Sequence, residues 1–128
     1  MSIRQRIRFD SGVLRVEAAG DFSMEHATRA FMEMLRAVAQ HQAEKVLFDG
    51  RRLEGDPREF ERFLYGTFAA QGTSDLVREH QLAPRFAYVL HEPLRDPDKY
   101  GESVAVHQGM KVKVFETPEE ALKWLEFS

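Results

Sequence analysis

The chain has 128 residues, of which 43% are hydrophobic and 11% aromatic, with a formal net charge of -3 and no cysteine. This length suits a single domain, and the apolar content excludes an intrinsically disordered protein. The mildly acidic balance argues against nucleic-acid binding, and the lack of cysteine excludes disulfides, thiolate nucleophiles and Cys-ligated zinc. No apolar run approaches the roughly 20 residues that span a bilayer, so we expect a cytoplasmic protein without integral membrane association.

The N-terminal region is predicted to form a β-hairpin. Apolar and polar residues alternate over residues 3–9 and again over 13–18, and the intervening Asp10–Gly12 favours a turn. The first strand has an apolar face made by Ile3, Ile7 and Phe9 and an opposite face made by Arg4, Arg6 and Arg8. The three arginines either protect a sheet edge from pairing or form a basic strip for an acidic partner or anionic headgroups.

A helix and a buried strand are expected next. Ser23 is a favoured N-cap residue, and His41 and Gln42 follow the last periodic position. The helical apolar spacing is made by Ala27, Phe31, Met34, Leu35 and Val38. The short apolar run of residues 46–48 is typical of a strand buried on both faces, and residues 49–55 are predicted to be the loop that leaves its carboxyl end.

A second helix is predicted to begin with Asp56 as the cap, Pro57 at the first helical position and Glu59 closing a capping box. We expect residues 72–74 to break or kink it and residues 75–81 to add a turn or two. Its predicted buried stripe consists of Phe60, Phe63, Leu64, Thr67 and Phe68. These aromatic residues, together with Tyr65, belong either to the core or in part to an apolar pocket for a lipid tail.

The remaining chain continues the alternation of strands and helices. We expect a strand over residues 85–90, a helix from Asp96–Pro97 to Gly109, a strand over 112–115 and a helix capped by Thr117–Glu120. The order is β-β-α-β-α-β-α-β-α. This order predicts an α/β fold with a mixed, mostly parallel sheet and right-handed crossovers.

Three stretches carry a family resemblance: residues 46–49 with the loop and helix after them, residues 85–90, and residues 109–125. With this element order, the chain resembles the anti-sigma-factor antagonist (STAS) domains of the SpoIIAA-like form, and the branch grouped with SEC14-type lipid-binding domains. The resemblance implies one domain over residues 1–128. It also implies a non-enzymatic regulatory or binding module for a protein partner or for a small ligand, either a lipid or another small molecule.

Members of this family that act as phosphorylation switches carry an Asp-Ser-Ser-Gly-type motif at the start of the second helix. The matching stretch here, Gly55–Arg58, contains no hydroxyl group. The resemblance therefore implies a module without the phosphorylatable serine of the sigma-factor switch. Asp56 is then either a plain N-cap or a permanent negative charge at the helix start.

Candidate binding residues cluster where strands end, because ligands of open α/β sheets bind beyond the carboxyl ends of the strands. The candidates are Asp49, Arg51, Arg52, Asp56, His91 and Glu92, with Glu116 on the same rim. Arginines can hold an anion and a histidine can titrate near neutral pH. The alternatives are a solvated loop layer, a small-ligand or anion site, and an enzyme that uses His91 as acid or base.

The sequence contains no recognisable catalytic motif. There is no Gly-x-Ser-x-Gly elbow and no glycine-rich phosphate loop, and His91-Glu92 lacks the second histidine of a zinc-protease helix. We therefore expect no catalytic residue, no metal and no cofactor. A third hypothesis is a structural subunit that assembles with itself, for example as a homodimer.

Overall fold

The computed structural model describes residues 3–127, which form strands and helices in the expected order. The elements are β1 (Arg4–Asp10), β2 (Val13–Asp21), α1 (Met24–His41), β3 (Lys45–Glu54), α2 (Glu59–His80), β4 (Arg85–Val89), α3 (Tyr100–His107), β5 (Val112–Phe115) and α4 (Pro118–Phe127). Within this part of the chain, no helix is both long enough and apolar enough to cross a bilayer.

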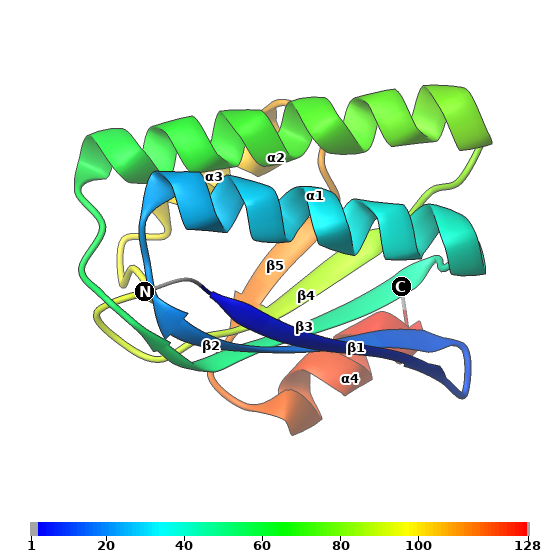
Figure 1. Ribbon diagram of the computed structural model, residues 1–128, viewed down its shortest axis with the longest axis horizontal. Coiled ribbons are helices and arrows are strands. Elements are labelled where there is room, and N and C mark those ends of the chain that lie inside the picture. The colour runs from blue at the N-terminus through cyan, green and yellow to red at the C-terminus, as the bar shows by residue number, and fades with distance from the viewer. Residues whose placement is uncertain (1–2, 128) are drawn as a thin grey trace.

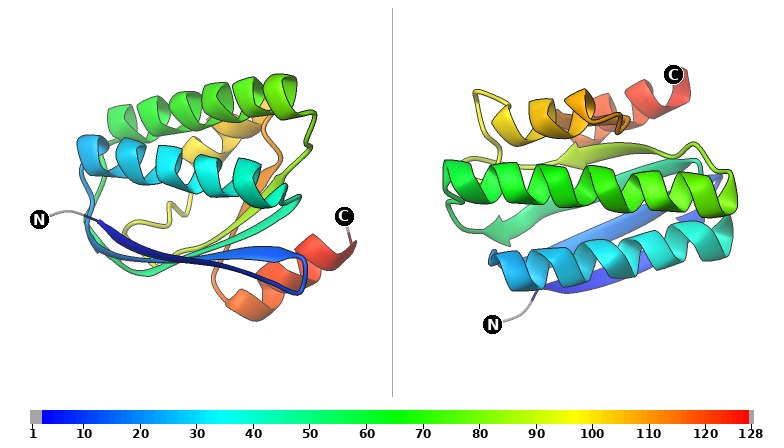
Figure 2. Two further views of the ribbon diagram at one scale, coloured as in Figure 1. Left: turned by 45° about the vertical axis from the view of Figure 1, so that its right-hand side comes forward. Right: turned by 90° about the horizontal axis from the view of Figure 1, so that it is seen from above.

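The five strands form one sheet in the order β1-β2-β3-β4-β5. β1 and β2 are antiparallel, and the other neighbouring strands are parallel, which confirms the predicted mixed sheet. Each strand lies beside the one before it in the chain, so right-handed crossovers place α1, α2 and α3 on the same face. These three helices lie side by side above the sheet, and α4 covers the opposite face (Figures 1 and 2).

The hairpin forms as predicted, with Ser11 and Gly12 at positive φ in the turn. Arg4, Arg6 and Arg8 are exposed on one face of β1, and Ile7 is half-buried on the other. Phe9 was expected on the buried face, but it lies at the sheet margin and is exposed, with its ring stacked on His41. Whether the arginines protect an edge or bind an anionic partner stays a prediction.

Helix α1 confirms its predicted cap and its predicted buried stripe. The Ser23 hydroxyl accepts a hydrogen bond from the amide of His26 at 3.2 Å, and Gln42 ends the helix at positive φ. The buried side chains are those of Ala27, Phe31, Met34, Leu35 and Val38. They pack against the sheet in the larger of two apolar clusters.

Helix α4 covers a smaller apolar cluster on the other face of the sheet. Its predicted cap at Thr117 is confirmed, because the Thr117 hydroxyl accepts from the amide of Glu120 at 3.3 Å. The Glu120 carboxylate accepts a hydrogen bond from the same hydroxyl at 3.1 Å, in place of the backbone amide of Thr117 that a complete capping box would use. Ala121 and Leu125 are buried against Leu47 and Val89 of the sheet.

The predicted loop over residues 49–55 is wrong, because β3 continues to Glu54. Glu17 pairs with Asp49 and Ala19 pairs with Arg52, so β3 contains one more residue than β2 between these two pairs. An extra residue of this kind is a β-bulge, which shifts the alternation of side chains between the two faces. The bulge extends the β2–β3 ladder and directs Leu53 towards the larger apolar cluster.

The predicted start of the second helix is also wrong. Asp56 and Pro57 precede it, the N-cap is Arg58, and the helix begins at Glu59. Pro57 is buried instead of opening the first turn, and the chain stays extended through Arg58. Glu61, rather than Glu59, closes the cap by accepting from the amide of Arg58 at 2.9 Å.

Helix α2 runs to His80 without the predicted break at residues 72–74. A Cβ atom at Gly72 would lie 3.0 Å from a methyl carbon of Leu35 in α1, so a residue without a side chain allows the two helices to pack closely. The Thr73 hydroxyl donates to the carbonyl of Ala69, which keeps its polar group bonded inside the helix. The glycine therefore serves helix packing and does not end the helix.

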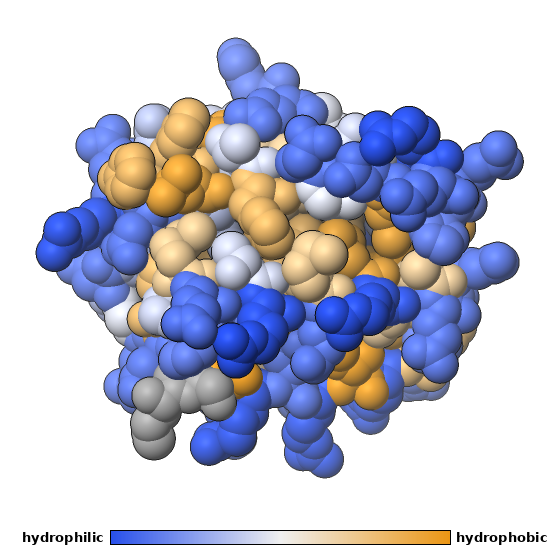
Figure 3. Space-filling model, turned by 45° about the horizontal axis from the view of Figure 1, so that its top comes forward, coloured by the Kyte–Doolittle hydropathy of each residue, from blue (hydrophilic) through white to orange (hydrophobic). Residues whose placement is uncertain are grey.

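The buried stripe of α2 differs from the predicted one. Its buried positions are Gly66, Ala69, Ala70, Thr73 and Leu76. Phe60, Phe63 and Leu64 are exposed, and apolar side chains are visible on the outer surface of the helical layer in Figure 3. Small residues face inward because α3 approaches closely: a Cβ atom at Gly66 would lie 2.7 Å from the carbonyl oxygen of Gly101.

Helix α3 begins at Tyr100, three residues after Pro97, which was predicted to open it behind a cap at Asp96. The Asp96 carboxylate accepts hydrogen bonds from the amides of Asp98 and Tyr100, both at 3.0 Å, and so caps a turn ahead of the helix. Lys99 has a φ of 55°, which separates this turn from the helix. The predicted end is confirmed, because Gly109 follows the C-cap at positive φ.

Candidate functional site

Two of the predicted rim residues, Asp49 and Arg51, form a bidentate ion pair. The Arg51 guanidinium donates from Nε to Asp49 Oδ1 at 2.9 Å and from a terminal nitrogen to Oδ2 at 2.7 Å. Hydrogen bonding from this side chain holds the pKa of Asp49 below its ordinary value, outweighing the opposing effect of burial. The guanidinium is therefore already neutralised, and an external anion would have to displace Asp49.

The other predicted rim residues are divided among separate contacts. His91 lies after β4 and adds to the electrostatic lowering of the Asp49 pKa. Glu92 pairs with Arg95 at 2.8 Å, and Glu116 lies 4.0 Å from the same arginine. Arg52 is exposed on β3. The structure thus brings Asp49, Arg51 and His91 together but does not gather the full predicted set.

The Asp49–Arg51 pair predicts a small change in acid stability. Because its pKa is lower in the folded than in the unfolded chain, ionised Asp49 stabilises the protein above about pH 4, and this contribution disappears as the pH falls through the folded pKa. We expect Asp49→Asn to reduce the loss of unfolding free energy between pH 7 and pH 3, that is, to flatten the acid limb of the stability curve, and the change should be less than about 1 kcal/mol. Urea unfolding at pH 7 and pH 3 measures the difference.

Arg51→Gln is the matched variant, because it removes the main cause of the shift while leaving the carboxylate. It should remove most of the pH dependence that Asp49→Asn removes, because the backbone amide of residue 51 and the charge of His91 still lower the pKa of Asp49. The double variant should add little to Asp49→Asn. An acid limb unchanged in both variants would contradict the assignment.

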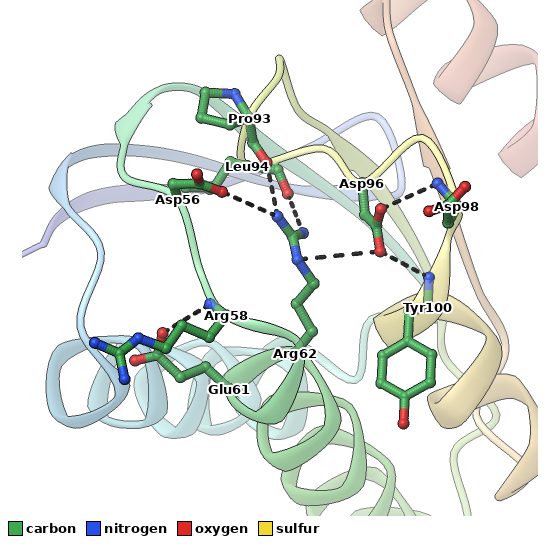
Figure 4. Close-up of polar contacts among 9 residues, drawn as sticks. All are labelled: Asp56, Arg58, Glu61, Arg62, Pro93, Leu94, Asp96, Asp98 and Tyr100. Carbon is green, nitrogen blue, oxygen red and sulfur yellow. Dashed lines mark hydrogen bonds and ion pairs between the residues drawn. The ribbon is translucent and has the colours of Figure 1, made fainter.

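Asp56 belongs to a second polar cluster, centred on Arg62 of α2 (Figure 4). The Arg62 guanidinium donates to the carbonyl oxygens of Pro93 and Leu94, both at 2.8 Å. It also lies 3.8 Å from a carboxylate oxygen of Asp56 and 4.0 Å from one of Asp96. The Arg62 side chain is only 15% exposed, whereas that of Asp56 is 80% exposed. This cluster fastens the start of α2 to the loop between β4 and α3.

The groups around Arg62 also determine the pKa of Asp96. Burial raises the pKa of Asp96, but the hydrogen bonds from the amides of Tyr100 and Asp98 and the nearby charge of Arg62 outweigh it. The net pKa is below the ordinary value, so the carboxylate is ionised at neutral pH. An ionised Asp96 holds both the turn before α3 and the guanidinium of Arg62 in place.

A cavity of about 160 Å³ lies between the sheet and the layer of α1, α2 and α3. Its walls are largely apolar and include Phe31, Phe48, Leu53, Leu90, Met110 and Val112. Arg62, Asp96 and Lys99 line it as well, so the polar cluster around Arg62 lies at one side of the cavity. A dry cavity of about 150 Å³ lined by aliphatic and aromatic side chains is large enough to bind benzene.

Two tyrosines provide polar groups within the apolar wall. Tyr65 of α2 and Tyr88 of β4 both line the cavity, and their hydroxyl oxygens are 2.9 Å apart. Burial raises the pKa of Tyr65 to about 12 and that of Tyr88 well above its ordinary value. Both side chains are therefore neutral hydroxyl groups at physiological pH.

Arg62, Asp96, Tyr88 and the cavity were not among the site features predicted from the sequence. One available signal was a tyrosine inside the buried strand over residues 85–90, because a buried phenol usually finds a hydrogen-bond partner. The long-range contacts of Arg62 have no comparable local signal, since its two carbonyl acceptors lie 31 and 32 residues away in the chain.

Among residues 3–127, no group of three or more His, Asp and Glu side chains is arranged to hold a metal ion. His91 and Glu92 follow β4 in a turn and not in a helix. The histidine-glutamate pair therefore has a different local structure from the helical zinc-protease motif considered in the sequence.

Two solved structures share this architecture. The chain matches the crystal structure of an anti-sigma factor antagonist from Mycobacterium paratuberculosis with a TM-score of 0.63 and 14% identity, over 98% of this chain and 95% of that chain. It matches an uncharacterized protein of the DUF3478 family with a SpoIIAA-like fold, from Shewanella loihica PV-4, with a TM-score of 0.51 and 20% identity, over 97% and 94%. No protein-family model and no curated protein matches the chain. The predicted SpoIIAA-like fold is confirmed.

Proposed function

We propose that this SpoIIAA-like domain is a non-enzymatic binding module that holds the apolar part of a small molecule in the cavity between its sheet and its helices. The observation that carries the proposal is a partly open, largely apolar space of about 160 Å³ beside a charged cluster. Its size suits a ring or a short acyl group and is below the roughly 300 Å³ at which drug-sized pockets begin. The part of the ligand held in the cavity is therefore smaller than a complete long-chain lipid.

Toluene is the direct probe of this proposal. We expect a toluene titration followed by NMR to shift signals of residues lining the cavity, such as Ala69, Ala105 and Met110. Ala69→Leu adds three carbons at a lining position and should weaken toluene binding at least tenfold. Because the cavity accepts the added carbons, the free energy of unfolding should stay within about 1 kcal/mol of the wild-type value.

Ala70→Leu is the matched control in the next position of the same helix. The two alanines are 2% and 3% exposed, but only Ala69 lines the cavity. Ala70→Leu should lose about 1–3 kcal/mol of stability through overpacking. Cavity signals that do not respond to toluene, or equal toluene binding by wild type and Ala69→Leu, would contradict the proposal.

A protein partner is the second candidate. It is supported by the fold shared with an anti-sigma factor antagonist and by three apolar side chains, Phe60, Phe63 and Leu64, exposed on one helix. The stretch Gly55–Arg58 has no hydroxyl group, so this module works without a phosphorylated serine there. Mass spectrometry of the protein purified gently from its native source distinguishes a bound metabolite from a lipid, another protein or a second copy of the chain.

The remaining parts of the hypothesis stay predictions. They are a cytoplasmic location, a homodimer, and ligand binding by Asp49, Arg51, Arg52, Asp56, His91 and Glu92. The enzymatic alternative would use His91 with the two arginines, but Arg51 is already bonded to Asp49. The apolar cavity is therefore the better supported site.

A further inference from the structure

Tyr65 and Tyr88 approach each other from opposite layers of the fold. Tyr88 belongs to β4, inside the sheet, and Tyr65 belongs to α2, above it. Their rings are held by aromatic neighbours: the ring centroid of Tyr88 is 4.6 Å from that of Phe48, and Tyr65 meets Phe31 edge-on at 5.9 Å. The hydroxyl pair is therefore fixed by packing at the wall of the cavity.

The pair has one hydrogen-bond donor more than its mutual bond uses. Each neutral phenol carries one O–H donor, and the bond at 2.9 Å requires only one of the two protons. Among residues 3–127, the hydrogen-bond partner of each of these two hydroxyl groups is the other hydroxyl. Buried donors without an acceptor are rarer in proteins than acceptors with a free lone pair. The second proton is thus available to an acceptor inside the cavity.

We propose that the tyrosine pair recognises an uncharged carbonyl compound, by donating this second O–H to the carbonyl oxygen of the ligand. The inference rests on the proposed function and adds the chemical class of the ligand. A ligand that only donates, such as a phenol, leaves the tyrosine donor unsatisfied. A carboxylate would lose its hydration among the aromatic rings of the wall, which is far more unfavourable than burying a neutral carbonyl.

The test compares acetophenone with ethylbenzene, which has nearly the same shape but lacks the carbonyl oxygen. Both dissociation constants are measured by NMR titration on the wild-type protein and on the double variant Tyr65→Phe/Tyr88→Phe. Replacing both partners of a hydrogen bond by apolar groups of the same shape is close to neutral for stability, so the double variant should fold. We expect the preference for acetophenone over ethylbenzene to fall about three- to tenfold in the double variant.

Two further variants make the result specific. Tyr88→Phe leaves the hydroxyl of Tyr65 free to donate and should keep the preference for acetophenone. Tyr100→Phe removes the remaining tyrosine of the chain, which does not line the cavity, and should behave as wild type. If both probes bind and the double variant keeps the wild-type preference, the carbonyl inference is wrong while the cavity remains a binding site. If neither probe shifts the cavity signals, the inference and the proposed function are both wrong.

Discussion

Phe31→Ala should lower the free energy of unfolding by about 3–5 kcal/mol, the range found when buried phenylalanines are truncated. Phe31 is 1% exposed, and its ring contacts those of Tyr65, Phe68 and Phe86. It also lines the existing cavity, so its removal enlarges a space that the neighbouring residues already leave unfilled. We therefore expect a loss in the upper half of the range. Chemical denaturation monitored by far-UV circular dichroism provides the measurement.

Phe60→Ala is the matched control, because it makes the same chemical change at a side chain that is 68% exposed. Its effect should stay within about 0.5 kcal/mol. The pair also tests the orientation of α2, since the apolar spacing of the sequence had placed Phe60 in the buried stripe. Equal losses in the two variants would show that α2 is rotated from the orientation described.

The second large effect is expected at Arg62. Arg62→Met keeps the apolar stem but leaves the carbonyl oxygens of Pro93 and Leu94 without their donors and Asp96 without its nearby cation. Removing one partner from a mostly buried charged network destabilises the folded protein more than losing a surface ion pair. We expect a loss of about 2–4 kcal/mol in the free energy of unfolding, measured from urea denaturation at neutral pH.

Two variants separate the network from the ion pair at its margin. Asp56→Asn removes the exposed carboxylate of the cluster and should change stability by less than about 1 kcal/mol. Arg62→Lys keeps the charge but cannot reproduce the two parallel donors of a guanidinium, so it should recover only part of the loss. A stability for Arg62→Met as high as for Asp56→Asn would mean that the carbonyl contacts contribute little.

The helices that could be predicted from the sequence are those in which a cap residue and the apolar spacing indicate the same helix. In α1, the cap at Ser23 and the apolar spacing from Ala27 to Val38 agree, and both are found in the structure. The last helix likewise combines a cap at Thr117 with buried Ala121 and Leu125. Because cap and spacing depend on residues within one helix, they can be read without knowledge of the tertiary contacts.

Helix α2 could not be predicted in the same way, because its neighbours determine its orientation. Apolar spacing favours Phe60 and Phe63 as core residues, whereas close contact with α1 and α3 requires Gly66 and Gly72 on the inner side. The sequence pattern ranks residues by hydrophobicity and does not include the distance between packed helices. Because Gly66 and Gly72 face the neighbouring helices, Phe60 and Phe63 are left exposed on α2.

The predicted rim residues are not gathered into one crevice, and the reason is topological. A crevice at the strand ends forms where the strand order reverses, so that successive helices lie on opposite faces. Here the order β1-β2-β3-β4-β5 never reverses, and α1, α2 and α3 cover one face together. The rim residues therefore divide into small ion-pair groups such as Asp49 with Arg51. The cavity lies instead beneath the three helices and is lined by side chains from many elements.

The same strand order has a consequence for how the protein is made. Each new strand pairs with the strand synthesised just before it, across a connection of a single helix in the parallel part of the sheet. No strand has to be inserted between two that are already paired, and folding is generally faster when contacts join nearby parts of the chain. As the chain leaves the ribosome, the sheet can grow from β1 towards β5 with one advancing edge, which the next segment to emerge then covers.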